Sequence, residues 1–156
     1  MSPGPYLNTG PFKTRITDND AVGPVEELGV WRFEAGKILR YVKSGSLIPR
    51  FESCKFDTAV TTAALMGNQV LQCDGATNMF AGVAESTFAN LSFGWVTLYG
   101  PATARVAALT IPGTPLGPDI TATGVLSVRN ISHFNAAAVA VQSGLSMGSA
   151  VFVSGL

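Results

Sequence analysis

The sequence has little charge and no long apolar run. Charged residues make up only 13% of the 156 positions, about half of the roughly 25% usual for a soluble domain. Its apolar stretches are short, whereas a membrane-spanning helix needs about 18 or more apolar residues in sequence. Residues 1–10 lack the basic and then apolar pattern of a signal peptide. We therefore expect no membrane insertion, synthesis in the cytoplasm, and a surface that contacts other protein.

Residues that carry chemistry are also scarce. Ten basic and ten acidic residues give zero net charge, so no cationic field favours nucleic acid. With two cysteines and one histidine, the chain has too few ligands for a structural zinc site, and Cys54 and Cys73 are expected to be separate buried thiols. His133 is the sole candidate for a histidine base, and no nucleophile elbow or glycine-rich phosphate loop accompanies it. The sequence predicts no catalytic site, metal or cofactor.

The few charges are unevenly distributed. Fifteen of the twenty lie in the first 57 positions, leaving five for the other 99, namely Asp74, Glu85, Arg105, Asp119 and Arg129. Apolar or small-residue surface patches of more than a few hundred Å² usually mark contacts, so we infer that much of the C-terminal half faces other subunits. The alternative is a surface of serine, threonine, asparagine and glycine, which are plentiful here.

The N-terminal segment differs from the rest in composition. Residues 1–24 contain four prolines and three glycines and have no sustained apolar period, which predicts an extended arm. Tyr6, Leu7 and Phe12 are its candidate anchors on a neighbouring molecule. Residues 25–156 would form one β-rich domain.

Short apolar and β-branched runs separated by turn residues predict about eight or nine strands. The runs are a hairpin within 29–45 that turns at Ala35-Gly36, then 68–73, 79–84, 93–99, 105–111, 123–128, 137–142 and 150–154. The strand over 93–99 should stop at Gly100-Pro101, the PGTPLGP sequence at 112–118 should be an irregular loop, and residues 56–66 favour one short helix. This spacing predicts an all-β fold, a compact antiparallel sandwich or barrel-like domain.

Three segments resemble the capsid decoration, or cement, proteins of tailed phages. They are Phe33–Lys43 (FEAGKILRYVK), residues 80–102, whose GVA, FGWVT and GPA follow that family's pattern, and the closing AVAVQSG and SAVFVSGL. In the second segment Gly82 and Gly94 permit turns or bulges, and Trp95 and Val96 should point to opposite faces. The matches span residues 29–156 and leave the arm unmatched.

The resemblance implies a β-tulip-type domain that assembles as a homotrimer on the outer capsid surface. It would bind the major capsid protein and bridge adjacent capsomers, with no nucleic-acid or membrane partner. Besides the arm anchors, the candidate interface residues are Trp31, Phe33, Trp95 and Tyr99, for which ordinary core packing is the alternative. Two other functions remain open: another virion component such as a head-tail connector or tail protein, and a carbohydrate-binding or receptor-binding β module, for which Phe134 is the candidate exposed aromatic.

Overall fold

The computed structural model describes residues 11–75, 79–107, 110–119, 121–128, 136–141 and 148–154. These residues form eleven strands, and no helix occurs among them, which confirms the all-β prediction. The strands are β1 (Asn19–Asp20), β2 (Trp31–Glu34), β3 (Lys37–Ser44), β4 (Ser53–Phe56), β5 (Gln69–Gln72), β6 (Phe80–Ala84), β7 (Phe93–Ala104), β8 (Pro115–Pro118), β9 (Leu126–Val128), β10 (Ala138–Ala140) and β11 (Ser149–Ser154).

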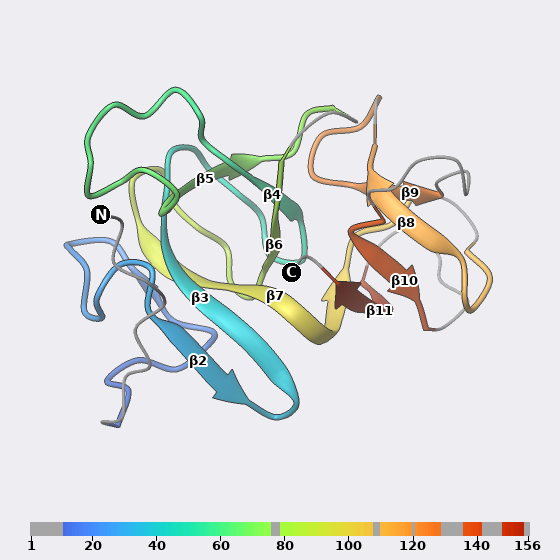
Figure 1. The fold of residues 1–156 in the computed structure, drawn as a ribbon, viewed down its shortest axis with the longest axis horizontal. Helices are drawn as coiled ribbons and strands as arrows, with labels where there is room; N and C mark the ends of the chain where they lie inside the picture. Colours follow the sequence, from blue (N-terminus) through green and yellow to red (C-terminus); the bar gives the residue numbers. More distant parts are fainter. Residues whose placement is uncertain are drawn as a thin grey trace.

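Five of the strands close into a barrel. Their order is β3-β5-β4-β6-β7, and pairing between β3 and β7 completes the circle (Figure 1). Four of the five pairings are antiparallel, but β3 and β5 run parallel, with Lys43 opposite Gln69. The barrel interior is filled by buried apolar side chains, namely Val42, Ile48, Cys54, Val70, Ala81, Ala84, Phe88 and Val96.

The hairpin that carries β2 and β3 has the predicted turn. Ala35 and Gly36 both have positive φ angles, 50° and 75°, as a two-residue hairpin turn of type I′ requires. The register follows directly, with Glu34 opposite Lys37 and Phe33 opposite Ile38. The predicted strands at 68–73, 79–84, 123–128, 137–142 and 150–154 are also present, with ends that differ by a few residues.

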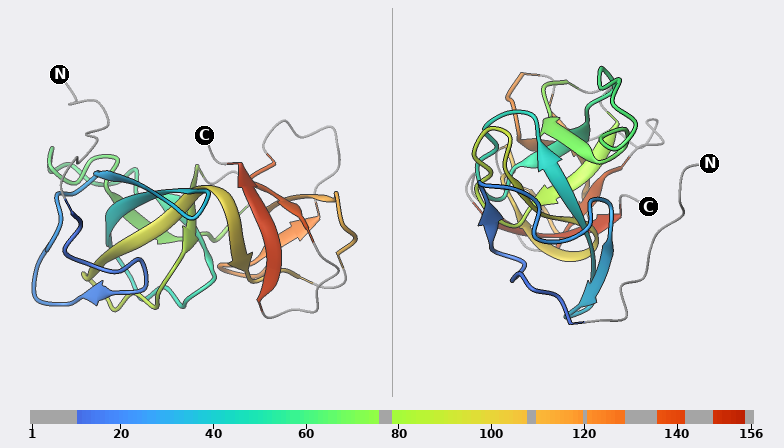
Figure 2. Two further views of the ribbon diagram at one scale, coloured as in Figure 1. Left: turned by 90° about the horizontal axis from the view of Figure 1, so that it is seen from below. Right: turned by 90° about the vertical axis from the view of Figure 1, so that its left-hand side faces the viewer.

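Strand β7 leaves the barrel and continues into a second sheet. Its first half pairs with β3 and β6, and Tyr99 to Ala104 pair with β11, followed by β10, β8 and β9. The barrel and this second sheet lie side by side along the longest axis of the molecule (Figure 2, left). The second sheet has its own apolar core, which includes Ala102, Leu116, Leu126, Val151 and Val153.

Two predictions about proline were wrong. The strand expected to stop at Gly100-Pro101 continues to Ala104, and the expected loop at 112–118 contains β8. Beyond Tyr99, the described partner strands of β7 lie only on the β11 side, so a proline without an N–H group is tolerated at this one-sided edge. In β8 the two prolines occupy the first and last positions, where fewer ladder donors are needed.

Two further element predictions were wrong. Residues 56–66 end β4 and then form turns instead of a helix, in keeping with the three β-branched residues Val60 to Thr62. In the described part of 105–111, Val106 makes only an isolated bridge to Leu126 in place of a strand.

Residues 11–30 lie along the outer side of the barrel. Phe12, Ile16 and Leu28 pack against a buried group on β3 and β7 that includes Tyr41 and Trp95. The Phe12 and Trp95 rings meet edge to face, with their centroids 5.3 Å apart. This part of the predicted arm therefore contacts its own barrel, whereas residues 1–10 are outside the described residues.

A candidate contact surface

The second sheet carries no charge in its strands. None of β7, β8, β9, β10 and β11 contains a lysine, arginine, aspartate or glutamate. The four ion pairs among the described residues lie elsewhere, on β2, on the barrel and at its junction with the sheet. The charged residues are therefore unevenly distributed in the folded molecule as well as along the sequence.

One face of this sheet is open to solvent. Along β11, buried residues alternate with partly exposed ones, so that Ala150, Phe152 and Ser154 share the outer face. On β10, Val139 lies opposite Phe152, and directly paired residues point to the same side of a sheet. Val141 continues this face and is 55% exposed. The outer face is therefore uncharged and largely apolar.

Aromatic side chains extend this face onto the barrel. Phe33 is paired with Ile38, Ile38 is paired with Tyr99, and the Tyr99 ring meets Phe152 edge to face with centroids 5.0 Å apart. Phe33 is 56% exposed and Tyr99 39% exposed. We call Phe33, Ile38, Tyr99 and Phe152 the aromatic row. It crosses four adjacent strands, β2, β3, β7 and β11.

A β-bulge places Tyr99 in this row. The register between β3 and β7 shifts between Ile38 and Leu39, so Leu39 pairs with Thr97 while Ile38 pairs with Tyr99. Without that shift, Tyr99 would share the side of Thr97, which is fully buried. The bulge turns the tyrosine outward, as bulges commonly do for functional side chains.

The neighbouring charges are paired. Lys37, next to Ile38 in the sequence, directs its Nζ to Glu85 Oε1 at 2.8 Å, and Thr97 Oγ1 donates to the same carboxylate oxygen. Glu85 is 8% exposed, so this pair lies below the surface. A partner that covers the aromatic row would therefore meet apolar side chains without having to desolvate a free charge.

The structure separates the predicted interface residues into three groups. Phe33 and Tyr99 lie in the aromatic row, and Trp31, on the same strand as Phe33, is partly buried. Trp95 is fully buried and Phe12 packs against it, so both belong to the protein's own core. Tyr6 and Leu7 lie outside the described residues. Sequence reasoning missed Ile38 and Phe152, although the alternation in SAVFVS could have indicated that Phe152 faces outward.

Polar contacts fix residues 11–26 to the barrel. Trp95 Nε1 donates to Thr14 Oγ1 at 3.0 Å, and Glu26, 7% exposed, accepts from the backbone N–H of Thr14 at 2.9 Å. Arg32 Nη1 donates to the Thr14 carbonyl at 2.6 Å, and its guanidinium lies 4.9 Å from the centre of the Phe12 ring. These contacts satisfy buried polar groups and hold the segment in place.

Tyr41 provides a second polar contact with this segment. Burial and a hydrogen bond to Asp20 raise the pKa of the tyrosine, so its hydroxyl stays protonated and donates to the Asp20 carboxylate. The same oxygen accepts from the backbone N–H of Val25 at 3.3 Å. Trp95 and Tyr41 are therefore anchors for the chain's own N-terminal segment.

The described residues contain no group of three or more metal-ligating side chains. No helix of the part that the structure describes is long and apolar enough to cross a membrane. Cys54 and Cys73 are free and buried, as predicted. His133 and Phe134, the candidate base and the candidate sugar-stacking aromatic, lie outside the described residues.

The fold has a relative among solved structures. No protein-family model matches the sequence, and no curated protein matches it. The chain is similar in structure to the N base of the head fiber gp8.5 of bacteriophage phi29, with a TM-score of 0.50 and 9% sequence identity. The match covers 75% of this chain and 93% of that one. At this identity the likeness shows a common fold.

Proposed function

We propose that this protein is a structural component of a bacteriophage head that works by contact and has no catalytic role. The observation that carries the proposal is the aromatic row on an uncharged sheet face, in a fold shared with the base of a phage head fiber. A surface of this kind buries apolar area against a partner and needs no reactive group.

In its more specific form, the proposal is a decoration subunit on the outer capsid surface. The sequence resemblance supports it, because it lies in the hairpin, in β6 to β7 and in the closing strands that carry the aromatic row. The subunit would bind the major capsid protein, bridge adjacent capsomers and assemble as a homotrimer. Since it would bind only the assembled lattice, it would stabilise that lattice by mass action.

The test is binding of the purified protein to phage heads that lack it. The double variant F33S/Y99S removes two exposed aromatic side chains, and each buried aromatic anchor contributes about 2 kcal/mol or more to an interface. We expect the affinity for heads to fall at least about hundredfold. The matched control is L47S, which removes a side chain that is 59% exposed in the loop between β3 and β4 and is not part of the row.

Three results would contradict this proposal. One is binding of F33S/Y99S at the wild-type level, which would remove the aromatic row from the interface. Another is a location inside the head or on the tail in electron micrographs. A copy number near a dozen, where a decoration protein has hundreds, would favour a connector. The mass of the protein in solution tests the trimer separately.

A further inference from the structure

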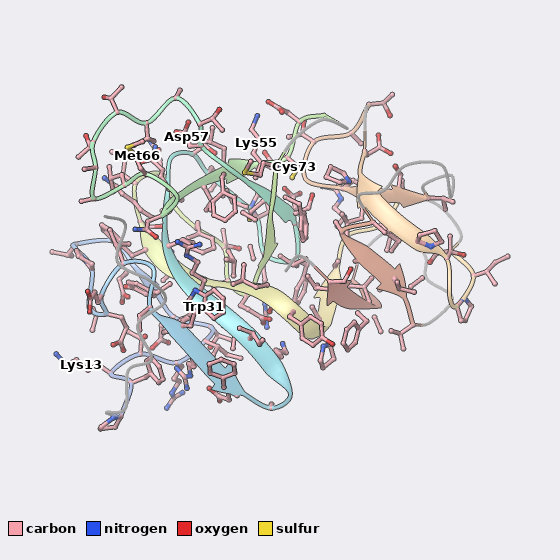
Figure 3. The ribbon with its side chains drawn as sticks, viewed as in Figure 1. Lys13, Trp31, Lys55, Asp57, Met66 and Cys73 are labelled. Carbon is pink, nitrogen blue, oxygen red and sulfur yellow. The ribbon has the colours of Figure 1, made fainter. Side chains whose placement is uncertain are left out.

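A pocket of about 420 Å³ opens beside the barrel, apart from the aromatic row. Arg40 of β3 lines it, together with Phe56 at the end of β4 and Met79 just before β6. The loop between β4 and β5 supplies the remaining lining residues, namely Asp57, Thr58, Val60, Met66 and Gly67. Figure 3 labels Asp57 and Met66 on this loop.

Arg40 occupies an unusual position for a charged residue. It lies opposite Val96 in the register of β3 and β7, two residues before Val42, and both valines belong to the barrel core. The side chain is partly buried, and this burial lowers its pKa below the ordinary arginine value. A guanidinium remains charged even so, and therefore requires compensation for the water it has lost.

The described surroundings compensate Arg40 only in part. Its Nη2 donates to Asn68 Oδ1 at 2.8 Å, and the guanidinium carbon lies 5.6 Å from the centre of the Phe56 ring. Its Nε is buried and has no hydrogen-bond partner in the described structure. None of the four ion pairs among the described residues includes Arg40.

The nearby carboxylate of Asp57 is engaged by its own loop. Its Oδ1 accepts from the backbone N–H of Ala59 at 3.0 Å, and its Oδ2 accepts from Gln69 Nε2 at 2.8 Å. Asp57 therefore organises the start of the loop and forms no ion pair with Arg40. A carboxylate from outside the chain would supply the negative charge that the guanidinium of Arg40 lacks beside it. Arginine binds carboxylates through two parallel N–H groups.

Apart from Arg40, Asp57 and Thr58, the side chains that line the pocket are apolar. Met66 and Met79 are 61% and 64% exposed, and Phe56 and Val60 add further apolar surface. Methionine is flexible and polarisable and adapts to side chains of different shapes. The pocket is near the small end of ligand sites, which span about 300 to 1,000 Å³. It suits one or two side chains of a partner better than a long lipid chain.

We propose that this pocket binds a segment of a partner polypeptide in which a carboxylate stands beside an aliphatic side chain. The carboxylate meets the guanidinium of Arg40, and the aliphatic group lies between Phe56 and the two methionines. The site shares no residue with the aromatic row and does not depend on the proposed function. A contact made by apolar burial alone does not select for charge or direction. The ion pair with Arg40 would add both kinds of selectivity.

The test uses N-acetyl-leucine, which carries one carboxylate beside one aliphatic side chain, on the full chain. N-acetyl-leucinamide is its neutral match, and amide chemical shifts report the site and the affinity. For a ligand this small we expect a Kd on the order of millimolar. The carboxylate should bind at least about tenfold more tightly than the amide, with shifts at residues 56–67 and Met79.

Variants then assign the effect to Arg40. R40Q should remove the difference between acid and amide, and R40K should retain only part of it because the paired donors are lost. K55Q is the matched control. Lys55 precedes Phe56 in the sequence, but its Nζ donates to Asp74 and the residue does not line the pocket. The comparison of acid and amide on the wild-type protein stands even if R40Q folds poorly.

Equal affinity for the acid and the amide on the wild-type protein would overturn the proposal, as would shifts confined to another surface. Octanoate provides a further arm, because it has the carboxylate and a long alkyl chain but no peptide group. Binding of octanoate more than about tenfold tighter than N-acetyl-leucine would overturn the assignment to a polypeptide and point to a fatty acid.

Discussion

The joint between the barrel and the second sheet depends on one buried carboxylate, Glu52. Its side chain is 1% exposed, and its Oε1 accepts from Arg105 Nη1 at 2.7 Å. Its Oε2 accepts from Gln72 Nε2 and faces Gly124, whose missing side chain leaves room for the carboxylate. Glu52, just before β4, thus connects β5 of the barrel to Arg105, which follows β7, and packs beside Gly124, which precedes β9.

The substitution E52Q keeps the shape but removes the charge and places an amide N–H₂ group among donors. Hydrogen bonds to charged groups contribute about 1.5–3 kcal/mol each, and Arg105 is 46% exposed, so water reaches its side of the pair. We therefore expect E52Q to lower the free energy of unfolding by about 2 kcal/mol. For a chain of this size, this corresponds to a fall in Tm of roughly 4–8 °C.

The measurement is urea unfolding followed by tryptophan fluorescence and circular dichroism. A double-mutant cycle with R105M should give a coupling of about 1–2 kcal/mol, since the two side chains contact each other. E34Q is the control, because Glu34 is 42% exposed in its pair with Arg32 and should change stability by less than about 0.5 kcal/mol. A loss below about 0.5 kcal/mol for E52Q, or a coupling near zero, would refute this account of the joint.

Three other predictions concern acid stability, backbone geometry and thiol reactivity. Burial alone would raise the pKa of Asp119, but hydrogen bonds from Thr121, Ala122 and Ser127 outweigh it and lower the pKa from 3.8 to about 2. The resulting stabilisation of about 2 kcal/mol is present above pH 3.8 and lost as the pH falls through 2. Urea unfolding between pH 2 and 5 should show this loss, and D119N should remove it; an identical pH dependence in D119N would contradict the assignment. Gly100 has a φ of 104°, and a Cβ there would overlap the Gly36 carbonyl oxygen, so G100A should cost more than about 2 kcal/mol of unfolding free energy. The control G23A, where nothing lies within 4 Å, should be neutral, and equal stabilities for the two would disprove the strain. Burial raises the pKa of the Cys54 thiol well above its ordinary value and that of Cys73 to about 11, so a disulfide reagent at pH 8 should react about a hundredfold more slowly with the folded protein than in urea. Similar rates in the two states would show that the thiols are accessible.

The sequence predicted several local features correctly. Alternating apolar residues and turn signals predicted the all-β class, and the Ala35-Gly36 pair predicted the hairpin and its turn. The adjacent residues Trp95 and Val96 face opposite sides, as expected for neighbours on a strand. The low charge of the C-terminal half predicted the uncharged outer face. Each of these follows from residues that are close together in the chain.

The candidate sites could be predicted only in part. Phe33 and Tyr99 were identified as aromatics of interest, but nothing in the sequence separates them from Trp95, which is buried beneath Phe12. The unpartnered Nε of Arg40 also has no sequence signal, because it depends on which loops surround the side chain. Both distinctions are matters of burial, and burial depends on long-range pairing.

What the sequence alone determined was the strand content, the hairpin and the separation of a charge-rich N-terminal part from a charge-poor C-terminal part, because these depend on local periodicity and composition. Only the tertiary structure decided the closure of β3 on β7, the parallel pairing of β3 with β5, and the aromatic row from residues 33, 38, 99 and 152. Strand pairing is fixed by contacts between residues far apart in the chain. A bulge of one residue reverses the face of the sheet to which the following side chains point. No local pattern contains that information.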